Sequence, residues 1–255
     1  MNTDFEKLRR MLSLETTERL IVEDEYINLF DEIAKFLIEE CVISWNEYEY
    51  GFQNIEFYLY NKNHKDIITH PRISKALQWY INDFGGIDIN FESKYDESNV
   101  YTNNNAKKKP ILNDNCCFGG ILIRKLKLIN QPEDHQTSNL SKGNQILEGP
   151  LACAEMFRLC DAENGECSFP KLKIMHSGLK IKEKSKAERE EIEKNGRHNI
   201  LRAGQTARDK VKNILSGYVN EKENVINYDN NNQIIEDMIK QFNKYKYKPY
   251  WYSAE

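Results

Sequence analysis

Apolar residues near the start of the chain recur at intervals of three and four, the spacing of one helix face. The pattern runs from Phe5 to Cys41 and predicts two helices, separated near residues 14–16. Residues 41–45, Cys-Val-Ile-Ser-Trp, are typical of a strand. A polar turn is expected next, at residues 47–51.

Two later segments alternate between apolar and polar positions, as half-buried strands do. Residues 54–60 and 86–91 each place apolar side chains on one face and polar side chains on the other. The polar positions are Glu56, Tyr58 and Tyr60 in the first segment, and Asp88 and Asn90 in the second.

Residues 120–128 predict another strand, in which Arg124 is expected on the same face as Leu122 and Leu126. An arginine on such a face requires a partner, because an unpaired buried charge is costly. Residues 73–81 fit either a helix or a strand.

The remaining segments are loops and helices, and they show no regular alternation of strand and helix. Loops are expected at residues 92–114 and 131–144, and helices at residues 149–159, 180–194 and 234–242. This order predicts an α+β fold in a single domain, a curved and mostly antiparallel sheet surrounded by helices. We expect N-terminal helices over residues 1–33, a core over 34–212 and a C-terminal extension over 213–255.

The chain has 255 residues, with 36 Lys and Arg against 40 Asp and Glu, and a formal net charge of −4. No apolar run approaches the ~18 residues that span a bilayer, so a membrane protein is not expected. The first residues lack the basic and apolar layout of a secretory signal. We therefore expect the protein in the cytoplasm, or at the nucleoid if its source is bacterial.

Six cysteines in such a compartment are expected to be reduced. Cys153, Cys160 and Cys167 recur every seven residues, but a helix end is expected before the third. The adjacent Cys116 and Cys117 suit neither tetrahedral metal ligation nor an easy mutual disulfide. Buried or incidental thiols are favoured, and neither a metal nor a cofactor is expected.

Charge is distributed unevenly along the chain. Residues 171–212 carry 13 Lys and Arg against 6 Asp and Glu, and residues 105–130 carry 6 against 1. These segments total +12, so the remainder holds −16. One interpretation is a basic face that binds a polyanion, and the other is a solvated helix with an exposed lysine loop.

Several segments, taken in order, resemble the alkyladenine (3-methyladenine, methylpurine) DNA glycosylase family. Residues 55–59, Ile-Glu-Phe-Tyr-Leu, look like that family's Glu-Ala-Tyr-Leu strand, and residues 34–37 resemble the helix before it. Residues 66–70, Asp-Ile-Ile-Thr-His, are similar to its Asp-x-x-x-His loop.

The resemblance continues toward the C-terminus and covers about two-thirds of the chain, residues 34–202. The spacing from Tyr80 to Asn90 matches the family's tyrosine-to-asparagine spacing. Residues 121–124 resemble its Leu-Leu-Arg strand, and residues 149–154 its Gly-Pro helix start. Either Arg197 or Arg202 corresponds to its arginine near the C-terminal end.

The resemblance implies a monofunctional DNA glycosylase that flips out damaged purines, alkylated or deaminated, and removes them by hydrolysis in base excision repair. Glu56 would act as general base and stabilise the cationic sugar, and Arg124 would pair with a phosphate and help to place the water. The base would lie between Tyr58, His70 and Tyr80, with Asn90 at the floor of its pocket.

The implied partner is double-stranded DNA containing a lesion, bound by a monomer. DNA contacts are expected from Phe84, Lys107, Lys108, Lys109, Lys125, Arg197 and Arg202. Asp83 stands where the family has a large wedge residue, and a one-residue shift would place Phe84 there instead.

Two other functions fit the same residues. One is a member of this fold that has lost catalysis, or now binds another nucleic acid or a nucleoside, which the acidic balance and Asp83 favour. The other is a non-enzymatic interaction protein whose Lys-Glu helix binds a partner protein.

Overall fold

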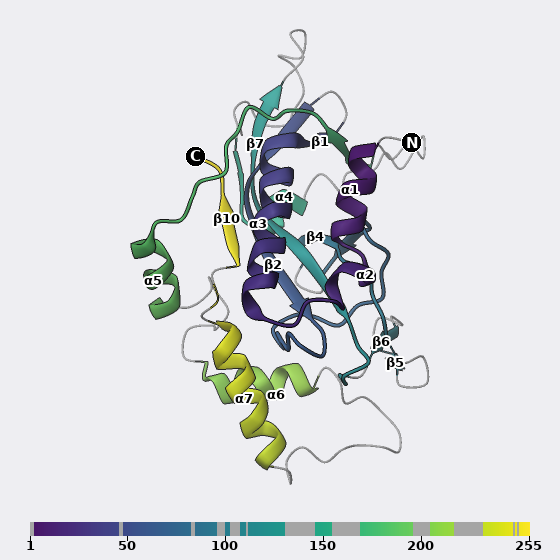
Figure 1. The fold of residues 1–255 in the computed structure, drawn as a ribbon, viewed down its shortest axis with the longest axis vertical. Helices are drawn as coiled ribbons and strands as arrows, with labels where there is room; N and C mark the ends of the chain where they lie inside the picture. Colours follow the sequence, from purple (N-terminus) through teal and green to yellow (C-terminus); the bar gives the residue numbers. More distant parts are fainter. Residues whose placement is uncertain are drawn as a thin grey trace.

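An antiparallel sheet forms the centre of the molecule (Figure 1). The computed structural model describes residues 3–45, 48–82, 85–95, 100–102, 108–110, 112–130, 146–154, 169–195, 205–216, 232–246, 248 and 250–255. The order across the sheet is β3 (Trp79–Ile81), β4 (Ile87–Asn90), β7 (Phe118–Asn130), β2 (Tyr48–Tyr60), β1 (Cys41–Trp45) and β9 (Lys171–Ile174).

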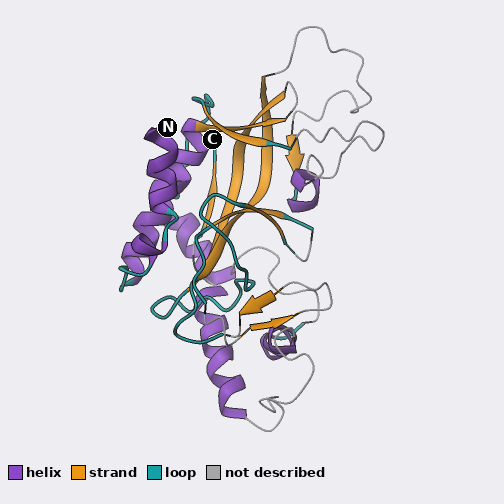
Figure 2. Cartoon of the chain, turned by 90° about the vertical axis from the view of Figure 1, so that its right-hand side faces the viewer, coloured by secondary structure: helices purple, strands orange, loops and turns teal. Residues whose placement is uncertain are grey.

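Two further strands extend this sheet. β10 (Trp251–Ser253) pairs with β2, and β8 (Ile146–Glu148) pairs with β7. A separate ladder joins β5 (Val100–Thr102) to β6 (Lys108–Pro110). The sheet is curved and carries helices (Figure 2), so the predicted α+β class is confirmed.

Three N-terminal helices, α1 (Thr3–Met11), α2 (Leu14–Thr17) and α3 (Glu23–Glu40), lie against one face of the sheet (Figures 1 and 2). The apolar face of α3 packs on β2. It covers the alternating apolar residues of β2 that the sequence pattern predicted to point inward. The ring of Phe30 stacks on that of Phe57 at a centroid distance of 4.7 Å, and both are fully buried. α3 ends where Cys41 takes an extended backbone conformation and begins β1.

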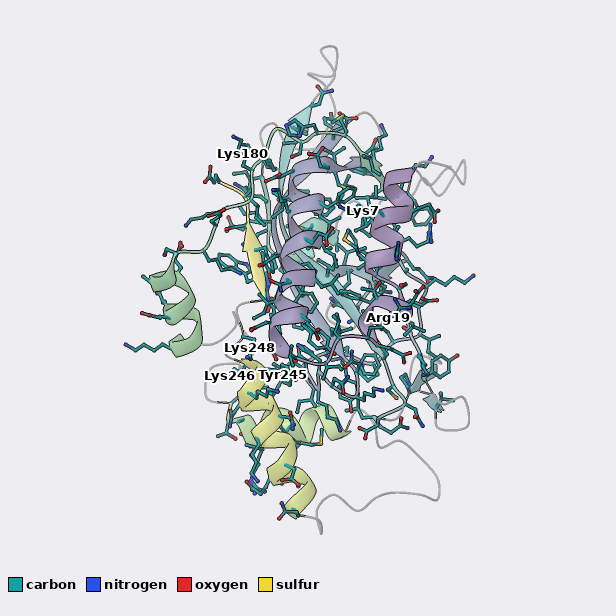
Figure 3. All side chains as sticks on the ribbon, in the orientation of Figure 1. Lys7, Arg19, Lys180, Tyr245, Lys246 and Lys248 are labelled. Atoms are coloured by element: carbon teal, nitrogen blue, oxygen red, sulfur yellow. The ribbon has the colours of Figure 1, made fainter. Side chains whose placement is uncertain are left out.

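The helices of the second half are α4 (Pro150–Ala154), α5 (Lys186–Asn195), α6 (Ala207–Ser216) and α7 (Asn232–Lys246). Phe242 and Tyr245 of α7 are buried in the same core as α3. Figure 3 shows Tyr245 and Lys248 beside the start of α3, where Nζ of Lys248 lies 3.6 Å from Oε1 of Glu23. The described part of residues 213–255 therefore packs into the core and, through β10, into the sheet.

Several expected boundaries were wrong. The first 40 residues contain α1, α2 and α3 rather than two helices, and residues 48–51 begin β2 rather than forming a turn. Of residues 73–81 only the last three are strand, and the helix expected at 180 begins at Lys186. α6 was not expected from the sequence.

An irregularity between β2 and β7 changes the face on which Leu126 lies. Ile55 pairs with Ile123, Asn54 with Lys125 and Phe52 with Leu126, so each strand contains an extra residue. Ile123 and Leu126 both join the main core although they are three positions apart, a spacing that a regular strand places on opposite faces. Arg124 therefore shares a face with Leu122 but not, as expected, with Leu126.

Candidate active site

Five strands carry one row of directly opposed residues on the face away from α3. Trp251 pairs with Glu56, Glu56 with Leu122, Leu122 with Asp88, and Asp88 with Tyr80. Directly opposed residues of antiparallel strands point to the same side. We call this side the polar face and define it by Glu56, Tyr58, Tyr80, Asp88, Asn90 and Arg124.

Glu56 of β2 and Arg124 of β7 form an ion pair on the polar face. Nε of Arg124 donates a hydrogen bond to Oε2 of Glu56, and Nη2 lies against the same oxygen. Nη2 also donates to the hydroxyl of Tyr58, at 3.3 Å. Arg124 is the extra residue of β7, and a β-bulge of this kind redirects the side chain at the irregularity.

Burial makes the pair electrostatically unusual. The side chain of Glu56 is 1% exposed and that of Arg124 is 13% exposed. Burial by itself would lower the pKa of Arg124, but the neighbouring Glu56 carboxylate, with Tyr58, raises it above its ordinary value. Arg124 therefore remains a cation beside the carboxylate.

A second ion pair, between Arg72 and Asp88, lies on the same face. Both side chains are 3% exposed, and Nη1 of Arg72 donates to Oδ2 of Asp88. The same nitrogen donates to Oδ1 of Asn90 at 3.1 Å, and the guanidinium carbon lies 4.4 Å from the centre of the Tyr80 ring. Asn82 donates to the other Asp88 oxygen at 3.3 Å.

Gly120 lies between Tyr58 and Asn90 on the polar face, and it pairs directly with both. A Cβ atom at this position would lie 2.6 Å from Nη1 of Arg72 and 3.1 Å from Asp88, so only glycine leaves room for both.

Four buried charges on one sheet face are unexpected for stability alone. Buried ion pairs contribute little compared with apolar residues of similar volume, since desolvation offsets their attraction. Clusters of buried charges of this kind are more typical of functional sites. These four charges lie beside the Tyr58 hydroxyl, the Asn90 amide and the Tyr80 ring. The cluster offers a carboxylate for proton transfer, cations for an anionic group, and flat surfaces on which a ring could stack.

The catalytic and base-binding residues that the sequence nominated lie in two groups on or beside the polar face. Arg124 contacts Glu56 and Tyr58, and Arg72 contacts Tyr80 and Asn90. His70 is half-buried, and its carbonyl oxygen accepts from Nε of Arg72 at 3.1 Å.

The nominated DNA contacts are mostly outside the described residues. Nζ of Lys125 lies 3.5 Å from Oε2 of Glu148 on β8. Phe84, Lys107, Arg197 and Arg202 are outside the described ranges, as are Asp83 and the side chains of Lys108 and Lys109.

Sequence reasoning missed Arg72 and Asp88 as site residues, although two signals were present. Alternation had placed Asp88 beside Asn90 on the polar side, where a carboxylate requires a cation. Pro71 restricts His70 to an extended backbone, so the loop is locally fixed and Arg72 follows it directly. The sequence does not show that this loop reaches β4.

The described residues contain neither a cluster of potential metal ligands nor a helix able to span a membrane. No group of three or more His, Cys, Asp or Glu side chains there is placed to hold a metal ion. Cys41, Cys116, Cys117 and Cys153 are buried. Among the described helices, none has the length and apolar character needed to cross a bilayer.

Among known proteins, the chain is similar to a viral protein. The chain is 29% identical over 147 residues to the uncharacterized protein L759 of Acanthamoeba polyphaga mimivirus, an alignment that covers 51% of this chain and 59% of the viral protein. It thus spans less than two-thirds of that relative's length. No protein-family model matches the chain. No solved structure matches it.

Proposed function

We propose that the protein is a monofunctional DNA glycosylase that flips out a damaged purine and removes it by hydrolysis. The observation that carries the proposal is that Arg124 contacts both Glu56 and Tyr58, which lie 68 and 66 positions from it in the sequence. These are three of the residues on which the family resemblance depends. No metal or cofactor is needed for this reaction.

Glu56 has the chemistry of the general base. A carboxylate beside the sugar can accept a proton from the attacking water and stabilise the cationic sugar as the N-glycosidic bond breaks. Arg124 orients this carboxylate and presents a cation where a phosphate of the flipped nucleotide would bind. The hydroxyl of Tyr58, held by Arg124, fixes the ring at the edge of the same site.

The remaining residues of the polar face would hold the base. Tyr58 and Tyr80 offer flat surfaces, and stacking of a base on an aromatic ring contributes ~1–3 kcal/mol. Asn90 offers an amide on the floor between them. Duplex binding would depend on the basic segments, residues 105–130 and 171–212, through salt-sensitive phosphate contacts.

The decisive experiment measures base release from duplexes that carry hypoxanthine, ethenoadenine or 3-methyladenine. We expect wild-type release from at least one duplex, and a ~10²–10⁴-fold lower single-turnover rate for Glu56→Gln at unchanged DNA affinity. Glu49→Gln is the matched control, because Glu49 is also a β2 glutamate in an ion pair, at 3.4 Å from Lys173. Release by Glu56→Gln at the wild-type rate would remove Glu56 from the mechanism.

A second function is favoured by one specific observation. Oε2 of Glu56 is already held by two nitrogens of Arg124, and the side chain is buried. Such a carboxylate suits a binding site of the same fold that recognises a nucleoside or nucleic acid without cleaving it. Tight binding of lesion-bearing DNA, with no base release from any of the three duplexes, would support this function over the first.

A further inference from the structure

Arg72 contacts three of the residues that would enclose a base, namely His70, Tyr80 and Asn90. It leaves the loop between β2 and β3, and its side chain is 3% exposed. Nε donates to the carbonyl oxygen of His70, and Nη1 donates to Oδ1 of Asn90, both at 3.1 Å. The guanidinium carbon lies 4.4 Å from the centre of the Tyr80 ring, within the range of a cation–π contact.

These contacts determine which end of the Asn90 amide is available. A guanidinium can only donate, so the amide atom that it contacts must be the oxygen. The other end, Nδ2, is buried and has no hydrogen-bond partner among the residues that the structure describes. An unsatisfied buried N–H group is costly, and such a group marks a place where a ligand acceptor would be favourable.

The alternative role for Arg72 is the simple neutralisation of Asp88. A lysine would serve that purpose nearly as well, because a charge is all that it requires. A lysine would not donate to His70, Asp88 and Asn90 from one rigid plane while lying flat on Tyr80. The two roles therefore predict different effects of the substitution Arg72→Lys.

We propose that Arg72 is a positioning residue, which fixes the Asn90 amide with Nδ2 as the donor and holds Tyr80 and His70 around the same ligand. Arg72 need not touch the ligand itself. The inference rests on the proposed function for the identity of that ligand, a purine base with a hydrogen-bond acceptor facing Asn90. It goes beyond that function in assigning a residue and a donor to the recognition step.

The first test compares Arg72→Lys with wild type and with Arg19→Lys, a matched control on an exposed arginine that pairs with Glu15 four positions away. The probes are a hypoxanthine duplex and the same duplex with undamaged adenine. We expect Arg72→Lys to raise Kd for the hypoxanthine duplex about tenfold, with the rate at saturation within about threefold of wild type. Wild-type Kd in a folded Arg72→Lys variant would overturn the proposal.

A second test needs neither activity nor DNA. In ¹H–¹⁵N spectra of the free wild-type protein, Nε–H of Arg72 should exchange with solvent far more slowly than that of Arg19. The Asn90 side-chain NH₂ signals should shift in Arg72→Lys and remain in place in Arg19→Lys. Exchange at Arg72 as fast as at Arg19 overturns the proposal even if Arg72→Lys does not fold.

The two proposals fail in different measurements. Absence of base release from every duplex contradicts the glycosylase and leaves the positioning role of Arg72 to the affinity and spectroscopic tests. Base release that persists in Arg72→Lys with unchanged Kd and unchanged Asn90 signals contradicts the positioning role and leaves the glycosylase in place.

Discussion

His64 and Tyr250 are 186 positions apart in the sequence, and Nε2 of His64 lies 2.7 Å from the hydroxyl oxygen of Tyr250. Nδ1 of His64 lies 2.8 Å from the carbonyl oxygen of Leu59, which can only accept, so Nδ1 carries a proton. The Tyr250 hydroxyl also donates to Glu23 of α3. This chain of contacts joins the C-terminal segment to β2 and to the first turn of α3.

Tyr250→Phe should destabilise the protein while leaving its fold intact. The substitution removes the hydroxyl and leaves Nε2 of the fully buried His64 without this partner. The free energy of unfolding should fall by ~1–3 kcal/mol, because a buried polar group loses a hydrogen-bond partner. Urea unfolding measures this difference, with Tyr95→Phe, at a partly exposed position, as control. Equal midpoints for the two variants would contradict the role of the contact.

Glu23 should make stability depend on pH. Burial raises its pKa above the ordinary value, Asp66 acts in the same direction, and Lys248 and Lys244 act against it. The folded protein therefore binds this proton more tightly than the unfolded chain does. The contribution of Glu23 to stability is then greatest below the ordinary pKa and declines as pH rises through the raised one.

Glu23→Gln removes that titration and isolates its effect. We expect the stability of wild type, relative to Glu23→Gln, to fall as pH increases from below the ordinary glutamic acid pKa toward neutrality. Urea midpoints at a series of pH values measure the trend, and His64 and Tyr250 are left unchanged in both proteins. A difference that stays constant, or grows with pH, would show that Glu23 ionises normally.

The alternating strands were the part of the fold that the sequence predicted well, because period-two patterning is a local property. The alternation over residues 86–91 predicted β4 and both of its polar positions. The extra residue at Arg124 could not be predicted, since a bulge depends on how two distant strands pair. For the same reason the sequence placed Leu126 on the wrong face.

The candidate site likewise contains some residues that the sequence predicted and others that it did not. The resemblance nominated Glu56 and Arg124 for one site, and the structure brings them into contact. Arg72 was missed because nothing in its neighbourhood specifies the loop path that carries it to β4. Asp88 was assigned to a polar face without a partner, and a search for the cation that such a buried carboxylate requires would have nominated nearby arginines.

Gly119 and Gly120 should respond differently to alanine. A Cβ at Gly119 would lie 2.4 Å from the carbonyl oxygen of Tyr58, and backbone of a paired strand cannot easily move away. A Cβ at Gly120 meets the Arg72 side chain at 2.6 Å. We expect Gly120→Ala to lower the free energy of unfolding by ~1–3 kcal/mol and to shift the Asn90 amide signals. Gly119→Ala should lower the free energy of unfolding by more than Gly120→Ala does. Unchanged signals in Gly120→Ala would contradict the crowding at Arg72.

The buried cysteines should resist alkylation in the native protein. Burial raises the pKa of Cys117 to about 12 and that of Cys153 to about 12, so the reactive thiolate is scarce at neutral pH. Peptide mass spectrometry after brief iodoacetamide treatment should find both unmodified, and both modified after the same treatment in urea. Rapid native labelling of either thiol would show that its surroundings open to solvent.

Glu56 and Arg124 should be strongly coupled in stability, and this coupling separates folding from catalysis. Arg124→Gln leaves a buried carboxylate without its cation, which typically costs ~3–5 kcal/mol, whereas Glu56→Gln leaves a cation that is 13% exposed. The double variant Glu56→Gln, Arg124→Gln removes both charges, so its unfolding free energy should exceed that of Arg124→Gln alone. Losses that simply add across this cycle would mean that the two side chains do not interact. If stability recovers in the double variant while base release stays absent, the loss of activity cannot be attributed to unfolding. The double variant is then better folded than Arg124→Gln and lacks only the carboxylate and the guanidinium assigned to the reaction.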